Sequence, residues 1–115
     1  MLSCDRYAKY DAMFRPIDSL AKERPDSALR LLEAMKPRIG DAPGRIKAYY
    51  GLMRTKYMLN AGARFTSDSA IRAVAGYYDR HGDDNQRMFS KLLLGCVNRS
   101  MGDNTEAMLN LEAAA

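Results

Sequence analysis

The sequence predicts an all-α protein, and three observations support this class. Helix-favouring residues are abundant among the 115 residues, including eight methionines and many alanines, leucines, arginines and lysines. Apolar residues recur at intervals of three and four, whereas alternating runs of Val, Ile and Thr, which are typical of strands, are missing. Prolines and glycines divide the chain into short segments. The length is typical of one domain.

The first part of the chain is expected to form two helices. Residues 7–23 contain Pro16, which should kink the helix or delay its start. Residues 24–35 place Pro25 in a first helical turn, where its missing N–H group costs nothing. The stretch 36–44, "KPRIGDAPG", should then break the pattern with two prolines and two glycines.

Four further helices are expected over 45–60, 67–81, 84–101 and 103–115. Ser67 is a suitable N-cap for the second of these. Gly82 should end it in the left-handed conformation, while His81 faces the negative end of the helix dipole and is interpreted as a helix-end residue. The last helix begins with Asp103 and Glu106 at capping-box spacing.

A repeat is visible when the last two segments are compared with the earlier ones. The stretch "LLLGCVNRSMGDNTEAMLNLEAA" has Leu-Gly, glycine, alanine, apolar residue and alanine at the spacing of a tetratricopeptide repeat. The same frame fits the middle pair of segments with a seven-residue enlargement, and the first pair with Arg15-Pro16 in place of Leu-Gly. The signature positions are Ala28, Gly51, Ala70, Gly95, Gly102 and Ala107. Gly95 is expected to let a neighbouring helix cross closely, and Gly102 to end its helix.

The chain thus resembles tetratricopeptide-repeat proteins, and the stretches "LAKERPDSALRLLEAM" and "TSDSAIRAVAGYYDRHGD" resemble a family from gut anaerobic bacteria. In that family, repeats follow a lipoprotein signal or precede a sensor kinase or helix-turn-helix domain. The resemblance implies a single domain over 7–115, with antiparallel hairpins at about 7–37, 44–82 and 84–115 stacked as a short right-handed solenoid. It also implies a fragment of a longer array, because the last helix lacks a polar cap. The alternative is a six-helix bundle with chance glycines.

The N-terminal "MLSC" resembles the end of a bacterial lipoprotein signal, which would make Cys4 the lipidated residue. This interpretation favours a periplasmic or membrane-anchored protein that meets the membrane only through that lipid. The alternative is a disordered terminus over 1–6 with an incidental thiol, and a cytoplasmic protein.

Catalytic and cofactor motifs are missing from the sequence. It contains no phosphate-binding loop, zinc-protease motif or nucleophile elbow. One histidine and two cysteines cannot fill a four-ligand zinc site without carboxylates. We therefore expect a non-enzymatic protein with no cofactor. Most methionines, among them Met88, should pack in the core, with an adaptable binding surface as the alternative.

The resemblance implies a partner-binding concave face made by the first helix of each hairpin. When the concave-face positions of the repeat are transferred to this sequence, they give a set of residues that is largely apolar with a few basic members. The set is Tyr10, Met13, Arg45, Leu52, Lys56, Phe89, Leu92, Cys96 and Arg99, completed by Ile17, Leu20, Ala21, Ala48, Thr55 and Ser100. This set lacks the asparagines and paired lysines of the carboxylate clamp, with which repeats of this family bind the C-termini of chaperones. The expected partner is a protein or peptide with apolar and acidic character.

Charge suggests one alternative function. Residues 36–64 carry seven basic residues against one acid, Asp41. Such a segment can attract nucleic acid, so a nucleic-acid-binding helical array is the alternative function, but a solvated helix face is the preferred explanation and a nucleic-acid partner is not expected. The apolar end of the chain also suggests self-association through the C-terminal helix.

Overall fold

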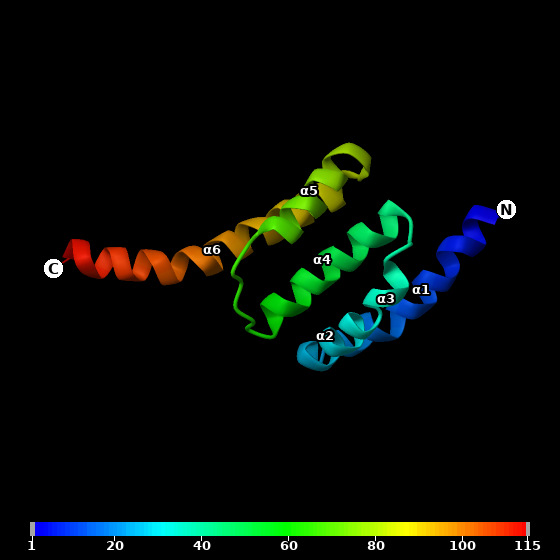
Figure 1. Ribbon diagram of the computed structural model, residues 1–115, viewed down its shortest axis with the longest axis horizontal. Helices are drawn as coiled ribbons and strands as arrows, with labels where there is room; N and C mark the ends of the chain where they lie inside the picture. Colours follow the sequence, from blue (N-terminus) through cyan, green and yellow to red (C-terminus); the bar gives the residue numbers. More distant parts are fainter. Residues whose placement is uncertain (1, 115) are drawn as a thin grey trace. The chain divides into compact units, whose positions relative to one another are not determined.

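The computed structural model describes the backbone of residues 2–114 and the side chains of residues 8–102 (Figure 1). All regular structure in this part of the chain is helical, which confirms the predicted class. The chain forms two compact units, Met1–Gly62 and Ala63–Ala115, and each is described by itself. The helices are α1 (Leu2–Ala21), α2 (Pro25–Ala34), α3 (Lys36–Ile39), α4 (Gly44–Asn60), α5 (Ser69–His81) and α6 (Asp84–Ala114).

The first unit contains α1 to α4. Helix α2 packs against both α1 and α4, and the short α3 lies between α2 and α4 in the chain. Figure 1 shows α1 and α4 running in the same general direction. Helix α2, which lies between them in the sequence, runs the opposite way. The turn after α1 is closed by the N–H of Arg24, which donates to the carbonyl of Leu20 at 2.8 Å. Pro25 is the first residue of α2, as predicted.

The core of this unit follows the helical period. Tyr10, Phe14 and Ile17 are buried on α1 at i, i+4 and i+7, which places them on one face. On α2, Ala28 and Leu32 have no exposed surface. Helix α4 carries buried residues on more than one face: Ile46, Ala48, Tyr50, Leu52, Met53, Thr55 and Tyr57.

Helix α1 begins earlier than predicted, and its start is not delayed to Pro16. It begins at Leu2, so the backbone predicted to be disordered over 1–6 is helical from Leu2 onwards. It also continues through Pro16, which the structure places inside the helix. Pro16 and Ala12 are both exposed, so the carbonyl group that loses its helical partner can be hydrated.

Helix α4 ends at Asn60 and is followed closely by Gly62, which was not predicted to have a role. Gly62 has φ +72°, the left-handed conformation that favours glycine. Its N–H donates to the carbonyl of Leu59 at 3.2 Å, and the N–H of Ala61 donates to that of Tyr57 at 2.9 Å. These bonds satisfy carbonyl groups of the last helical turn.

The second unit contains α5 and α6, which pack against each other. Buried residues from α5 include Ile71, Val74 and Tyr78, and those from α6 include Leu93 and Val97. The turn between the helices contains Gly82, but the prediction of a left-handed conformation there is wrong, since its φ is −92° and its ψ 168°. Glycine is required for space instead, because a Cβ would lie 2.8 Å from the Tyr78 ring and carbonyl oxygen.

Helix α6 is a single helix from Asp84 to Ala114, so the predicted break at Gly102 and the new start at Asp103 are wrong. Glycine lowers helix propensity but does not force an end unless it turns to positive φ. Gly95 lies within α6 too, and a Cβ built on it would meet no atom within 4 Å. The close helix crossing expected at Gly95 is therefore not seen.

The predicted hairpin over 44–82 joins α4 of the first unit to α5 of the second. The helical class is established. Two signature alanines differ in burial: Ala28 is fully buried and Ala70 is exposed. Gly51 is half-buried. The side chain of Ala107 lies outside the described residues.

Candidate binding sites

A pocket of about 490 Å³ lies in the first unit, between the C-terminal ends of α1 and α4. Its position follows from the fold, because the two helices run in the same direction and their last turns lie near each other (Figure 1). Its lining comes from α1, from the turn that follows it and from α4. Half of the lining residues are polar or charged and the others are apolar or aromatic: Asp18, Ala21, Lys22, Tyr49, Met53, Lys56, Tyr57 and Asn60.

Asp18 is the centre of the polar contacts in this pocket. The hydroxyl of Tyr49 donates to its Oδ2 at 2.5 Å, and the hydroxyl of Tyr57 donates to its Oδ1. Both oxygens of one carboxylate on α1 thus accept from α4, across 31 and 39 residues of sequence. Hydrogen bonds to a charged acceptor are stronger than neutral ones. This contact therefore ties the two helices together at the pocket.

The two tyrosines are held in different ways. Tyr57 is only 1% exposed, and burial, followed by the hydrogen bond to Asp18, raises the pKa of its hydroxyl well above the ordinary value. The ring of Tyr49 meets Phe14 edge to face, with the centroids 4.8 Å apart and an interplanar angle of 76°. Such pairs are favoured by the aromatic quadrupole. Both hydroxyl groups are therefore fixed against Asp18.

A second candidate surface lies on α6 in the second unit. Met88, Leu92, Gly95, Cys96 and Arg99 are exposed and recur at helical spacing, so they share one side of the helix, and we call this set the α6 face. Met88 is 70% and Leu92 60% exposed, so one turn of the helix presents two large apolar side chains to solvent. The buried residues Ser90, Leu93 and Val97 lie on the opposite side of α6.

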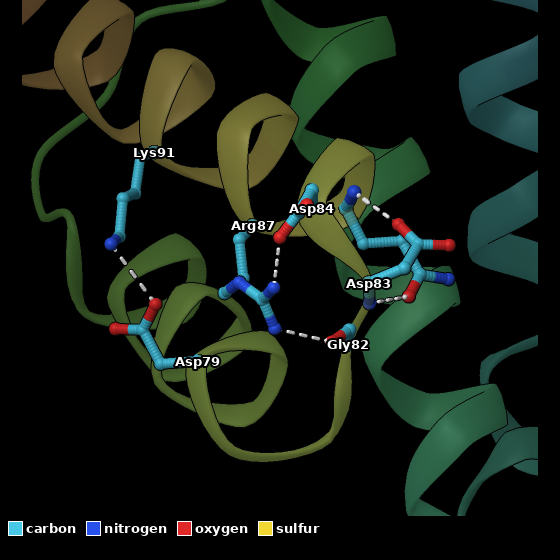
Figure 2. A network of polar contacts seen from close by, with 7 residues as sticks. Asp79, Gly82, Asp83, Asp84, Arg87 and Lys91 are labelled. Atoms are coloured by element: carbon cyan, nitrogen blue, oxygen red, sulfur yellow. Dashed lines mark hydrogen bonds and ion pairs between the residues drawn. The ribbon is translucent and has the colours of Figure 1, made fainter.

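Polar contacts at the start of α6 determine which side of this helix is exposed to solvent (Figure 2). Asp83 and Gln86 cap the helix reciprocally: the Gln86 N–H donates to Asp83 at 2.8 Å, and the Asp83 N–H donates to Gln86 at 3.0 Å. Arg87 donates to the carbonyl of Gly82 at 2.5 Å and pairs with Asp84. Lys91 reaches Asp79 on α5 at 3.1 Å.

The Lys91–Asp79 ion pair links α6 to α5, and Arg87 contacts the turn between the two helices at Gly82, as Figure 2 shows. They fix the rotation of α6 about its own axis, because Arg87 and Lys91 are one turn apart. The α6 face is thereby held away from α5.

The predicted concave residues are distributed between these two sites and the core. Lys56 and Ala21 line the pocket. Tyr10 and Leu52 are buried at 7% and 4% exposure, together with Ile17, Ala48 and Thr55, so their side chains have little surface to offer a partner. Leu92, Cys96 and Arg99 lie on the α6 face; Arg45 is exposed, and Met13, Leu20, Phe89 and Ser100 are half-buried.

Several residues of these sites were not predicted from the sequence. Lys22, Tyr49 and Met53 line the pocket but do not fall on the repeat's concave positions. Met88 was expected in the core, although its place one turn before Leu92 could have indicated the exposed stripe. Asp18 carries no sequence signal, because its partners are distant in the chain.

The described residues offer no group of three or more His, Cys, Asp or Glu side chains that could hold a metal ion. None of the helices, over the residues described, is long and apolar enough to span a bilayer. The side chain of Cys4, the predicted lipidation site, lies outside the described residues. Comparisons with protein-family models, curated proteins and solved structures found no match.

Proposed function

We propose that this chain is a non-enzymatic protein–protein interaction module of the tetratricopeptide-repeat type, acting as the sensing or scaffold part of a bacterial lipoprotein or signalling protein. The observation that carries this proposal is the α6 face, where Met88 and Leu92 expose most of their apolar surface side by side. Exposed apolar patches on otherwise ordinary surfaces mark interaction sites. The repeat frame in the sequence supports the same function.

The chemistry of the α6 face suggests its partner. Methionine is flexible and adapts to different apolar surfaces. Gly95 leaves the helix backbone open, since nothing beyond its chain neighbours and the nearby backbone of α6 lies within 4 Å of its Cβ position, so a partner can approach closely. Arg99 adds an exposed positive charge at one end. An amphipathic helix with apolar anchors and acidic flanking residues fits these features.

Binding to a synthetic peptide tests the proposal. The probe is an amphipathic helix with leucines at i, i+4 and i+7 and glutamates beside them, and its control is a scrambled peptide of the same composition. We expect saturable binding to the ordered peptide alone, weakened about tenfold or more by Leu92→Glu. Leu31→Glu is the matched control, because Leu31 is 49% exposed but lies on α2.

Three results would overturn this function. They are equal binding of the ordered and scrambled peptides, equal binding by the wild-type and Leu92→Glu proteins, and the absence of binding to either peptide.

A nucleic-acid-binding function is the second candidate, and one observation favours it. Lys36, Arg38, Arg45 and Lys47 are all exposed near the start of α4 and on α3. Such a cluster predicts binding to duplex or single-stranded probes that weakens steeply as salt rises. If neither probe shifts at low salt, this candidate is rejected. Arg54 is less available to it, since it pairs with Glu33 at 3.1 Å.

A further inference from the structure

The α6 face carries charges of opposite sign at its two ends. Asp84 lies one turn before Met88 on the same side of α6, and its side chain is 93% exposed although Arg87 contacts its Oδ1. Arg99 is exposed at the other end, and no ion pair joins it to another side chain within residues 8–102. At 3.6 residues per turn, these charges and the apolar residues between them fall within an arc of about 120°.

The two charges lie at nearly equal distances from Leu92. Asp84 precedes Leu92 by about 12 Å along the helix axis, and Arg99 follows it by about 10.5 Å, at a rise of 1.5 Å per residue. A twofold axis beside Leu92 would therefore bring Asp84 of one copy to within about 1.5 Å of the level of Arg99 in a second copy. The face is thus complementary in charge to an antiparallel copy of itself.

The middle of the face fits the same arrangement in shape. Leu92 would meet its equivalent at the axis, and Met88, about 6 Å to one side, would meet Gly95, about 4.5 Å to the other. Gly95 has no side chain and is exposed, so it leaves room for the longer methionine. The apolar surface that Met88 and Leu92 expose would be removed from water, and this drives association.

A parallel copy does not fit the charges. It would place Asp84 against Asp84 and Arg99 against Arg99, and like charges that face each other across an interface disfavour the pairing. The antiparallel copy instead brings Asp84 and Arg99 together at each end of the contact. Charged residues that flank an apolar helix seam set the orientation of the pair in this way.

We propose that the chain forms an antiparallel homodimer in which the α6 faces of two copies pack about a twofold axis at Leu92. The inference rests on the proposed function, because α6 is itself an amphipathic helix with apolar anchors and acidic flanking residues. The same surface serves both copies in a twofold interface. From Asp84 to Arg99 the contact is about 22 Å long, so it belongs to the small, weakly bound class of interfaces.

Sedimentation equilibrium of the full chain over about 5–500 µM measures this association. The apparent mass is expected to rise from 12.9 kDa toward twice that value. Leu92→Glu should weaken the self-association at least tenfold, whereas the control Leu31→Glu, on α2, should leave it unchanged. A monomer at every concentration, or a Leu92→Glu variant that dimerises like the wild type, would overturn the proposal.

Charge reversals test the antiparallel register. Asp84→Arg and Arg99→Asp should each weaken the homodimer about tenfold or more, because each opposes like charges at both ends of the contact. An equimolar mixture of the two variants should recover the wild-type affinity, since one copy then has only basic ends and the other only acidic ends. A mixture that associates no more tightly than either variant alone refutes the register.

Asp84→Arg also removes the contact with Arg87 at the start of α6, so circular dichroism must show that this variant is folded. If it is not, Arg99→Asp tests the register by itself, and unchanged self-association of Arg99→Asp refutes it.

The peptide assay distinguishes failure of this inference from failure of the proposed function. A chain that stays monomeric but binds the ordered helical peptide refutes the homodimer and supports the interaction module. A chain that dimerises as described but binds neither peptide supports the homodimer and rejects the acidic peptide as a partner.

Discussion

The hydroxyl groups of two buried tyrosines on α4 should differ sharply in their effect on stability. Tyr57 is 1% exposed and its hydroxyl donates to Asp18. Tyr50 is 8% exposed, and its hydroxyl is buried with no hydrogen-bond partner among the described residues. Replacing each by phenylalanine removes one oxygen atom from the same helix and leaves the ring in place. The pair therefore isolates the hydrogen bond.

The expected magnitudes follow from the two environments. A hydrogen bond to a charged acceptor contributes roughly 1.5–3 kcal/mol, so Tyr57→Phe should lower the free energy of unfolding by about 2 kcal/mol. Tyr50→Phe removes a polar atom that was desolvated without compensation. It should leave the free energy of unfolding unchanged or raise it by up to about 1 kcal/mol.

Urea denaturation followed by far-ultraviolet circular dichroism measures both variants, since the chain has no tryptophan to report by fluorescence. At an m-value of about 1–2 kcal/mol/M, Tyr57→Phe should lower the midpoint by about 1–2 M. A double-mutant cycle with Asp18→Asn should give a coupling energy of about 1 kcal/mol or more between Asp18 and Tyr57.

Two outcomes would refute this reasoning. If Tyr50→Phe destabilises as much as Tyr57→Phe, loss of packing rather than the hydrogen bond explains both effects. If the Asp18 and Tyr57 substitutions are additive, the contact between them contributes nothing that the cycle can detect.

Two further predictions concern pH and glycine. Burial and the Asp18 hydrogen bond raise the pKa of Tyr57 above its ordinary 10.0, so its contribution is fully present below pH 10 and declines above it. Alkaline urea titrations should therefore show the wild-type unfolding free energy falling up to about 1.4 kcal/mol per pH unit more steeply than that of Tyr57→Phe; parallel slopes would contradict this. Gly95→Ala should raise the thermal midpoint and add about 1 kcal/mol to the free energy of unfolding, because the new Cβ meets open space. Gly82→Ala should lower the thermal midpoint, because the new Cβ would clash with Tyr78. The same sign for both glycines would show that space does not decide their effects.

The sequence predicted those features that depend on local chemistry. The start of α2 at Pro25 follows from the fixed φ of proline, and the span 45–60 lies within α4 (Gly44–Asn60). Turn residues and helical spacing are properties of neighbouring positions, so they can be recognised in one chain. The place of His81 in the last turn of α5 was recognised for the same reason.

The pocket could not be predicted in this way. Asp18 meets Tyr49 and Tyr57 only because α1 and α4 are brought together by their packing with α2. No local pattern encodes a contact across 39 residues. The repeat pattern predicted Lys56 as part of a binding face. Lys22 was not predicted, because it lies one residue after Ala21, the last position of that pattern in the first helix.

A single substitution at Gly102 distinguishes a helix that ends there from a continuous α6. The repeat frame requires a left-handed glycine that ends a helix, and alanine in that conformation costs about 1 kcal/mol or more. The structure places Gly102 inside α6, where alanine improves helix stability by about 1 kcal/mol. Gly102→Ala should therefore raise the thermal midpoint and increase the helical dichroism. A lower midpoint would show that a helix ends at Gly102, which would favour the hairpin over 84–115 and contradict the continuous α6.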